Sequence, residues 1–270
     1  LDLKNNFSLL KDKLTVDLGF YGTRATREDA QLSPSDLVFS TTTAMYPYAR
    51  LADGAGNPLE VYREYNSIFK REAEAGGLLD WAFRPLEEYG KSVAESARND
   101  WRINLASKYK LSNTLGISAL YQYWENQGLN ETVNTEDSYF ARNLINLYLS
   151  YAIPNGAIYD VRKSKSQSHS ARMLLDYHEE LGVDFEVDGL LGAELKSLHA
   201  MNFSNRYYGY NPELAAVQPV DYINRFSRYT NPRSTARIPY VDNVSELTDR
   251  FYSAFANASV TYRNRYLLTA

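Results

Sequence analysis

Hydrophobic and polar residues alternate along several segments of the chain. In the segment 185–195 (FEVDGLLGAEL), the odd positions from Phe185 to Leu195 are apolar or glycine. Most even positions of the same segment are acidic or small. Because successive side chains of an extended chain point to opposite faces, this alternation predicts a β-strand with one apolar and one polar face. The same pattern recurs at 13–21, 100–109, 114–123, 169–177 and 252–262, and with partial strands at the two ends it predicts about eight strands.

The connections between these strands alternate between short and long. Four tight turns join the predicted hairpins, at 11–12, 112–113, 181–183 and 263–265. Three long insertions separate the hairpins, at about 28–97, 128–166 and 199–249. Alternate connections of a meander lie at the same end of the sheet, so all tight turns are expected at one end and all long loops at the other. This layout is typical of outer-membrane barrels, and three successive loops of this length are uncommon in soluble domains.

An apolar strand face can meet either a protein core or lipid, and the tyrosines favour lipid. Six of the 23 tyrosines lie toward the ends of the apolar faces: Tyr109, Tyr121, Tyr123, Tyr177, Tyr252 and Tyr262. Aromatic girdles occupy both interfaces of a membrane barrel, although tyrosine is also a common half-buried strand residue. The absence of an 18-residue apolar run excludes a transmembrane helix. We therefore predict an all-β antiparallel meander that is part of a large transmembrane β-barrel with three long extracellular loops.

Composition and motifs argue against nucleic-acid binding and enzyme chemistry. The net charge is −4, and there is no cysteine to form disulfides or thiolate metal sites. None of the three histidines has a metal-binding spacing, and His169 and His178 are expected on opposite strand faces. GxSxG and P-loop motifs are absent. We expect no enzyme activity, no cofactor and no nucleic-acid partner.

The predicted loops also contain long, ordered strings of residues. These are MYPYARLADGAGNPL (45–59), YREYN (62–66), GLLDWAFRPLEEY (77–89), DSYFARNLIN (137–146), IPNGAIYD (153–160), GAELKS (192–197), NRYYGYNPE (205–213) and DRFYSAFANASVTYRNRYLLTA (249–270). In this order they resemble the middle of the barrel region of SusC/RagA-type TonB-linked (TonB-dependent) outer-membrane transporters. The resemblance extends over nearly all of residues 1–270.

The resemblance implies a function that composition alone does not. Members of this family are large single-chain barrels, plugged by an N-terminal domain, that import nutrients such as glycans or peptides with energy passed by TonB. They pair with a SusD-like surface lipoprotein that closes over the mouth as a lid. Residues 1–270 would then be a portion of such a barrel in the lipid bilayer of the cell outer membrane. Both ends of the chain look cut inside strands, so we expect the signal peptide, the plug and the terminal strands to lie outside it.

Two sets of residues are candidates for the transport site. Loop residues with aromatic or guanidinium groups could stack on sugars, bond peptide groups or contact the lid: Trp81, Tyr139, Phe140, Arg206, Tyr207, Tyr208 and Tyr210. The alternative is that these clusters hold the loops together. Polar strand residues are expected to line a wet lumen: Asp17, Asp100, Arg102, Asn104, Lys108, Gln122, Glu186, Asp188 and Glu194.

A soluble β-rich domain that captures a glycan or a protein with its long loops is the alternative function. Two local predictions do not depend on this choice. Segment 136–149 can form a short loop helix with Phe140, Leu144 and Leu147 on one face. The run from Asp53 to Asn57 resembles the start of a calcium-binding loop, but Pro58 stands where that loop needs glycine, so a plain turn is expected.

Overall fold

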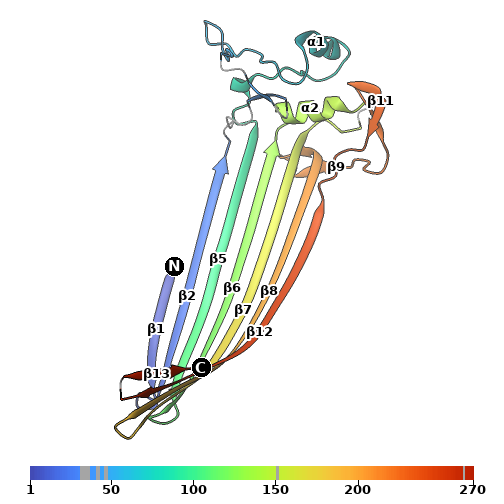
Figure 1. The fold of residues 1–270 in the computed structure, drawn as a ribbon. Helices are drawn as coiled ribbons and strands as arrows, with labels where there is room; N and C mark the ends of the chain where they lie inside the picture. The colour runs from blue at the N-terminus through green and yellow to red at the C-terminus, as the bar shows by residue number, and fades with distance from the viewer. Residues whose placement is uncertain (31–36, 41–42, 46–47, 150–151, 264) are drawn as a thin grey trace.

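One antiparallel sheet dominates the computed structural model, which describes residues 1–30, 37–40, 43–45, 48–149, 152–263 and 265–270. Its main path follows the chain through eight strands, each paired with the next on this path (Figure 1). In order they are β1 (Asp2–Leu9), β2 (Leu14–Asp29), β5 (Ser92–Lys110), β6 (Leu115–Asn134), β7 (Ala157–Leu181), β8 (Phe185–Asn211), β12 (Asn243–Tyr262) and β13 (Tyr266–Thr269). The predicted antiparallel meander is confirmed.

The tight turns lie at one end of the sheet and the long loops at the other (Figure 1). The first turn uses left-handed backbone, with positive φ at Leu10, Lys11 and Asp12. The second is closed by Ser112, whose Oγ accepts hydrogen bonds from the amides of Thr114 (3.2 Å) and Leu115 (3.0 Å). The predicted separation of short and long connections is therefore confirmed.

The strands continue further toward the loops than their alternation indicates. The ladder between β6 and β7 extends to Asn134 and Ile158, well inside a predicted insertion. The sequence there is polar on both parities, as in 162–168 (RKSKSQS). Strand pairing uses backbone groups and does not require an apolar face, so a strand can continue where its two-residue pattern has ended.

Small elements gather at the loop end of the sheet. They are α1 (Ser67–Ala75), the 3₁₀ helix η2 (Pro85–Glu87), α2 (Tyr139–Leu147), the hairpins β3 (Val38–Ser40)–β4 (Thr43–Ala44) and β10 (Phe226–Arg228)–β11 (Asn231–Ala236), and β9 (Ala216–Gln218), which pairs with β8. No helix among the described residues is long and apolar enough to cross a membrane.

Helix α2 confirms the short helix predicted from 136–149. It begins where the Ser138 hydroxyl accepts a hydrogen bond from the Ala141 amide at 3.2 Å, which is an N-cap. Its buried hydrophobic residues are Tyr139, Ala141 and Ile145, whereas Phe140 is 40 % exposed. The buried stripe is therefore rotated from the one expected, because polar residues of the same helix bond inward to a neighbouring loop.

The hydrophobic core lies in the loops and not on the sheet. One cluster joins Ile145 of α2 to Ile153, Tyr208 and Ile238. A second cluster packs Trp81, Phe83 and Tyr139 together. Both clusters sit at the loop end, so the faces of the long strands are left without a covering layer among the described elements (Figure 1).

Candidate functional site

The ladder register brings the apolar positions of the strands into a continuous band. Leu18 of β2 lies opposite Leu105 of β5, which lies opposite Tyr121 of β6. On the next two strands, Leu175 of β7 lies opposite Leu191 of β8. Directly paired residues of an antiparallel sheet point to the same face, so these side chains form one surface. We call this surface the apolar band.

The apolar band is exposed, although it is made of large hydrophobic side chains. Leu191 is 56 % exposed and Met173 is 55 % exposed. A soluble protein rarely leaves so wide a hydrophobic surface uncovered unless something binds there.

Aromatic side chains border the apolar band at both levels. On the loop side, Trp101 and Tyr123 contact each other with ring centroids 4.9 Å apart. On the turn side, Phe185 and Tyr262 contact each other at 4.8 Å. Between the two borders β5 has nine residues (101–109) and β12 has eleven (252–262). About 9–11 residues of a tilted strand cross a bilayer, so the band has the height of a membrane.

The opposite face of the same strands is a polar network. Trp124 Nε1 donates to Asp100 Oδ2 (2.9 Å), and Gln122 donates to Asn104 across β5 and β6 (3.0 Å). Glu194 bonds both Arg172 (2.6 Å) and Lys196 (2.7 Å). These residues belong to the polar surface, which we call the polar face; it also carries a few apolar side chains such as Phe251 and Phe255.

The lumen candidates all lie on the polar face. The register pairs Asp100, Arg102 and Asn104 of β5 with even-numbered residues of β6, and those in turn with even-numbered residues of β7 and β8. The β8 residues Glu186, Asp188 and Glu194 therefore share their side of the sheet. His169 lies on the face of the apolar band and His178 on the polar face, as expected.

A buried arginine joins the loop that contains Trp81 to helix α2. Nη1 of Arg142 donates to the carbonyl oxygen of Asp80 (2.6 Å), and Nη2 bonds Glu88 Oε1 (3.2 Å). The other oxygen of Glu88 accepts from the Tyr139 amide at 2.9 Å. Both charged side chains are more than nine-tenths buried, so each depends on the other for its charge to be compensated.

Two asparagines of α2 extend this attachment. The Asn146 side chain accepts from the Leu79 amide (3.0 Å) and donates to the Leu79 carbonyl (2.9 Å). The Asn143 side chain accepts a hydrogen bond from Trp81 Nε1 at 2.8 Å. One polar face of a two-turn helix therefore fixes a whole loop segment.

The same loop contains the carboxylate of Asp80, whose pKa is shifted by its neighbours. Burial alone would raise the pKa of Asp80, but hydrogen bonds with Glu74, Arg84 and the Ala82 amide hold that pKa at about 2. Arg84 Nη1 lies 2.7 Å from Asp80 Oδ2. Burial raises the pKa of the Tyr139 phenol above its usual range, and its hydroxyl has no hydrogen-bond partner among the described residues.

Three of the candidate ligand residues lie inside the loop clusters. Trp81 is fully buried, and Tyr139 and Tyr208 are 3 % and 1 % exposed. The Tyr208 hydroxyl donates to the Pro239 carbonyl at 2.8 Å. In this structure their side chains hold the loops together, and contact with a ligand would require the clusters to open.

The other four candidates reach the surface in two groups. Arg206 forms a bidentate pair with Asp160 (2.6 and 2.7 Å) and its guanidinium lies 5.2 Å from the ring centre of Phe140. Strand register places Asp160 and Arg206 on the polar face. Tyr207 and Tyr210 instead stack on Tyr159, with centroids 5.9 and 4.8 Å away.

A cavity of about 650 Å³ lies beside the Arg206 group, near the loop end of the sheet. Its charged lining residues are Arg27, Asp29, Glu95, Glu131, Asp160 and Arg162, together with hydroxyl and amide side chains. None of the residues that line it has an aromatic ring. The cavity therefore offers charge pairs and hydrogen bonds, with no surface on which a ring could stack.

Sequence reasoning missed the residues that organise the loops. Arg142, Asn146 and Glu88 lie within strings that carried the family resemblance, but no role was assigned to them. The signal was present in the spacing of Arg142 and Asn146, which are four residues apart and so share a helix face. The turn at Asp53, by contrast, is confirmed: Asp53 Oδ1 accepts from the amides of Ala55 (2.8 Å) and Asn57 (2.9 Å).

Comparison with known proteins gives structural neighbours only. No protein-family model matches the chain, and no curated protein matches it by sequence. Among solved structures it is similar to chains of the RagAB peptide importer in the closed-closed state (TM-score 0.66, 11 % identity), the RagAB peptide transporter (0.65, 12 %) and the RagAB importer in the open-open state (0.63, 12 %). The matches cover 97 %, 99 % and 97 % of this chain.

These matches establish the fold. The chain spans about a quarter of the length of each neighbour, at 26 %, 26 % and 25 %. Its long meander with loops at one end is thus the architecture of a part of those larger chains. The predicted resemblance to SusC/RagA-type barrels is confirmed at the level of the fold.

Proposed function

We propose that this chain is part of the wall of a TonB-linked outer-membrane transporter that imports nutrients. The observation that carries the proposal is the apolar band, which is exposed, bordered by aromatic side chains and of bilayer height. Lipid would cover this face, while the polar face would line an aqueous lumen. The fold shared with RagAB chains, which are described as a peptide importer, supports the same function.

A soluble binding module is less well supported by these side chains. Such a domain would have to bury Leu191, Met173 and their neighbours against a second layer, and the described elements supply none. Its long loops would be equally suitable for binding, so the loops do not decide between the two functions. The apolar band does.

We propose peptides rather than glycans as the transported class. The cavity beside Arg206 presents two guanidinium groups and four carboxylates, which complement charged termini and side chains of short peptides. Glycan sites usually provide aromatic faces, and that cavity has none. Energy from TonB and a SusD-like lid complete the proposal. Exposed loop tyrosines offer a docking surface for the lid, with Tyr48 92 % and Tyr89 69 % exposed.

Nitroxide labels test the orientation of the sheet. Each position from 185 to 195 is labelled in turn in the full-length transporter in lipid vesicles, and accessibility to oxygen and to a water-soluble nickel complex is measured. Labels at odd positions should be more accessible to oxygen, and labels at even positions to the nickel complex. Equal accessibility along the segment would contradict a wall between lipid and water.

Substrate class has a separate test. Cells expressing the full transporter are offered radiolabelled short peptides or oligosaccharides, and uptake is compared with that of an Asp160→Asn/Arg162→Gln variant. Peptide uptake that falls in the variant supports the peptide assignment. Uptake of oligosaccharides alone would contradict it while leaving the orientation of the sheet intact.

A further inference from the structure

A group of metal-ligating side chains lies on the polar face at the turn end, far from the loop cavity. His178 of β7 is the direct ladder partner of Asp188 of β8, and Glu186 follows two residues away on the same face. His178 Nδ1 lies 2.8 Å from Asp188 Oδ1 and 3.9 Å from Glu186 Oε1. All three ligand atoms lie within 4.8 Å of one another.

We propose that His178, Glu186 and Asp188 form a binding site for a divalent transition-metal ion, with Zn²⁺ as the ion that best fits the donors. One imidazole nitrogen and two carboxylate oxygens are ligands that Zn²⁺ accepts. Donors that share a Zn²⁺ at about 2.1 Å can be at most about 4.2 Å apart. The distances from His178 Nδ1 to Asp188 Oδ1 (2.8 Å) and to Glu186 Oε1 (3.9 Å) already meet this limit.

The scaffold of this site is rigid on both sides. β7 is paired with β6 up to Tyr177, and the His178 amide donates to the Thr114 carbonyl (2.8 Å). β8 is paired with β12 through both Glu186 and Asp188. From β12, the Ser259 hydroxyl points to Asp188 Oδ2 at 3.5 Å, so a third strand helps to orient one ligand. Hydrogen bonds of this kind tune a metal site by fixing the ligand that they contact.

Local charge also favours a cation. Glu180 lies directly opposite Glu186 in the ladder, and like charges in this arrangement repel each other. With Asp188, Asp176 brings the number of carboxylates on this face to four. No arginine or lysine among the described residues forms an ion pair with Asp176, Glu180, Glu186 or Asp188, and Glu186 and Asp188 have His178 as their basic neighbour.

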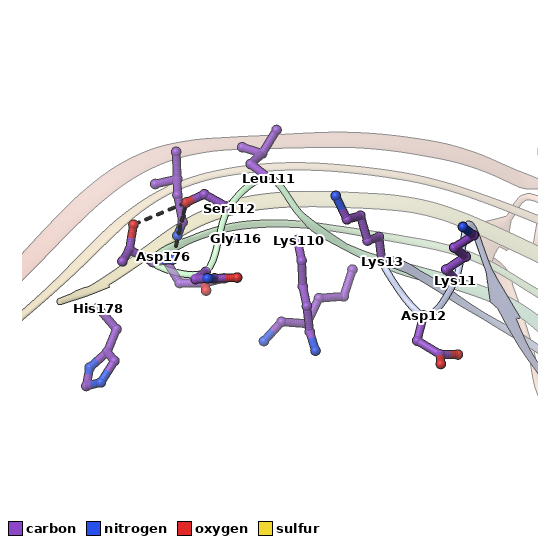
Figure 2. A pocket seen from close by; sticks show the side chains of 13 residues that line it. Lys11, Asp12, Lys13, Lys110, Leu111, Ser112, Gly116, Asp176 and His178 are labelled. Atoms are coloured by element: carbon purple, nitrogen blue, oxygen red, sulfur yellow. Dashed lines mark hydrogen bonds between the residues drawn. The ribbon is translucent and has the colours of Figure 1, made fainter. Parts of the chain in front are cut away.

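An open path leads to the site. A cavity of about 460 Å³ extends from the first two turns to Asp176 and His178, and Lys11, Lys13, Lys108 and Lys110 also line it (Figure 2). An ion held by three protein ligands would keep coordination positions free, and one of the ligands, His178, lines this open space. A bound ion would therefore be exchangeable and could bind a carboxylate from the solution or from another part of the protein.

Isothermal titration with ZnCl₂ tests the site in the detergent-solubilised, chelator-treated full-length protein. His178→Ala should remove one equivalent of bound Zn²⁺. Asp188→Asn, which keeps the shape of the side chain, should do the same, and it remains informative if His178→Ala does not fold. Ser259→Ala should weaken the same site by about tenfold, because it removes only the orienting hydroxyl.

Matched controls come from the other two histidines. His169 bonds the Tyr121 hydroxyl (2.8 Å) and His199 bonds Thr248 (3.2 Å), both on the opposite face of the sheet. His169→Ala and His199→Ala should leave the Zn²⁺ stoichiometry unchanged, and Mg²⁺ at equal concentration should not compete. The same stoichiometry in wild type, His178→Ala and Asp188→Asn would overturn the proposal. The strand register alone defines the site, so the result is independent of whether the protein imports peptides.

Discussion

The long sheet and the loop assembly treat their hydrophobic side chains in opposite ways. In the loops, Trp81, Phe83 and Ile153 are enclosed by protein, and polar side chains such as Asn146 close the assembly. In the sheet, Leu191 and Leu195 remain more than half exposed although their strand, β8, is paired on both sides, with β7 and β12. The loops bury their hydrophobic side chains as a small water-soluble domain would, whereas the exposed hydrophobic face of the sheet needs an apolar environment around it. The stability of the loop assembly therefore comes from its own contacts, whereas the stability of the sheet depends on its surroundings.

The largest effect that separates the two regions should come from Arg142. Arg142→Ala leaves the buried Glu88 carboxylate without its partner, so the loop assembly should lose about 3–5 kcal/mol. Hydrogen exchange of the amides in 77–89 measures this loss, and amides of β7 should keep their protection. The double variant Arg142→Met/Glu88→Leu is the control, since it removes both charges and should restore most of the protection. Equal loss in β7 would show that the two regions unfold together.

A charge in the apolar band should have the next largest effect. Leu105 lies midway between the aromatic borders of β5, and Leu105→Arg should cost about 2–4 kcal/mol in a bilayer. The adjacent Asn104→Arg places the same charge on the polar face and should change stability little. Urea unfolding of the full-length protein in lipid vesicles compares the two variants. Similar costs would contradict the assignment of one face to lipid.

Two glycines approach each other closely where the loops meet the sheet, and a substitution there should have a smaller effect. Gly156 has φ of +139°, and a Cβ there would lie 2.8 Å from the Cα of Gly209. Gly156→Ala should therefore cost about 1–3 kcal/mol, because neither backbone can move without breaking the ladder. Gly54→Ala, where a Cβ would meet no atom within 4 Å, is the matched control. The midpoint of thermal unfolding distinguishes them.

Lowering the pH should destabilise the loops before the sheet, and this is the smallest of the four predicted effects. The pKa of Asp80 is held at about 2, below the value of ~3.9 for an unfolded aspartate. Stability from its hydrogen bonds is thus complete above pH ~4 and is lost as the pH falls toward 2. Protection of the 77–89 amides should decline over that range in the wild type. In Asp80→Asn, which cannot titrate, it should not.

The sequence predicts some parts of this structure better than others, for physical reasons. Alternation identified the strands wherever one face is apolar and the other polar, as in 185–195. It ended at 162–168, where both faces are polar and only backbone pairing continues the strand. Register could place Asp100 and Glu186 on one face because parity is transmitted from strand to strand.

The loops were harder to predict, because an aromatic residue in a loop can serve a core or a ligand. Trp81 and Tyr208 were candidates for ligand contact, yet their side chains are enclosed. The sequence places Arg142 beside the aromatic candidates Tyr139 and Phe140 but does not show its partners, Asp80 and Glu88, on a distant segment. Contacts between residues about 60 positions apart, such as Arg142 with Asp80, leave no periodic trace in one sequence.

The length of the strands beyond the apolar band has an electrostatic consequence. On β8 the band ends near Leu195, and twelve residues further Tyr207 still belongs to the same strand. At ~3.3 Å per residue and a tilt of about 45°, the loops stand roughly 30 Å above the band. The Debye length at physiological salt is ~8 Å, so in the proposed membrane orientation a solute near the loops would be screened from charges on the membrane surface. Its first attraction or repulsion would then come from the rim itself, from groups such as Arg162 and Asp160, whatever lipids surround the protein.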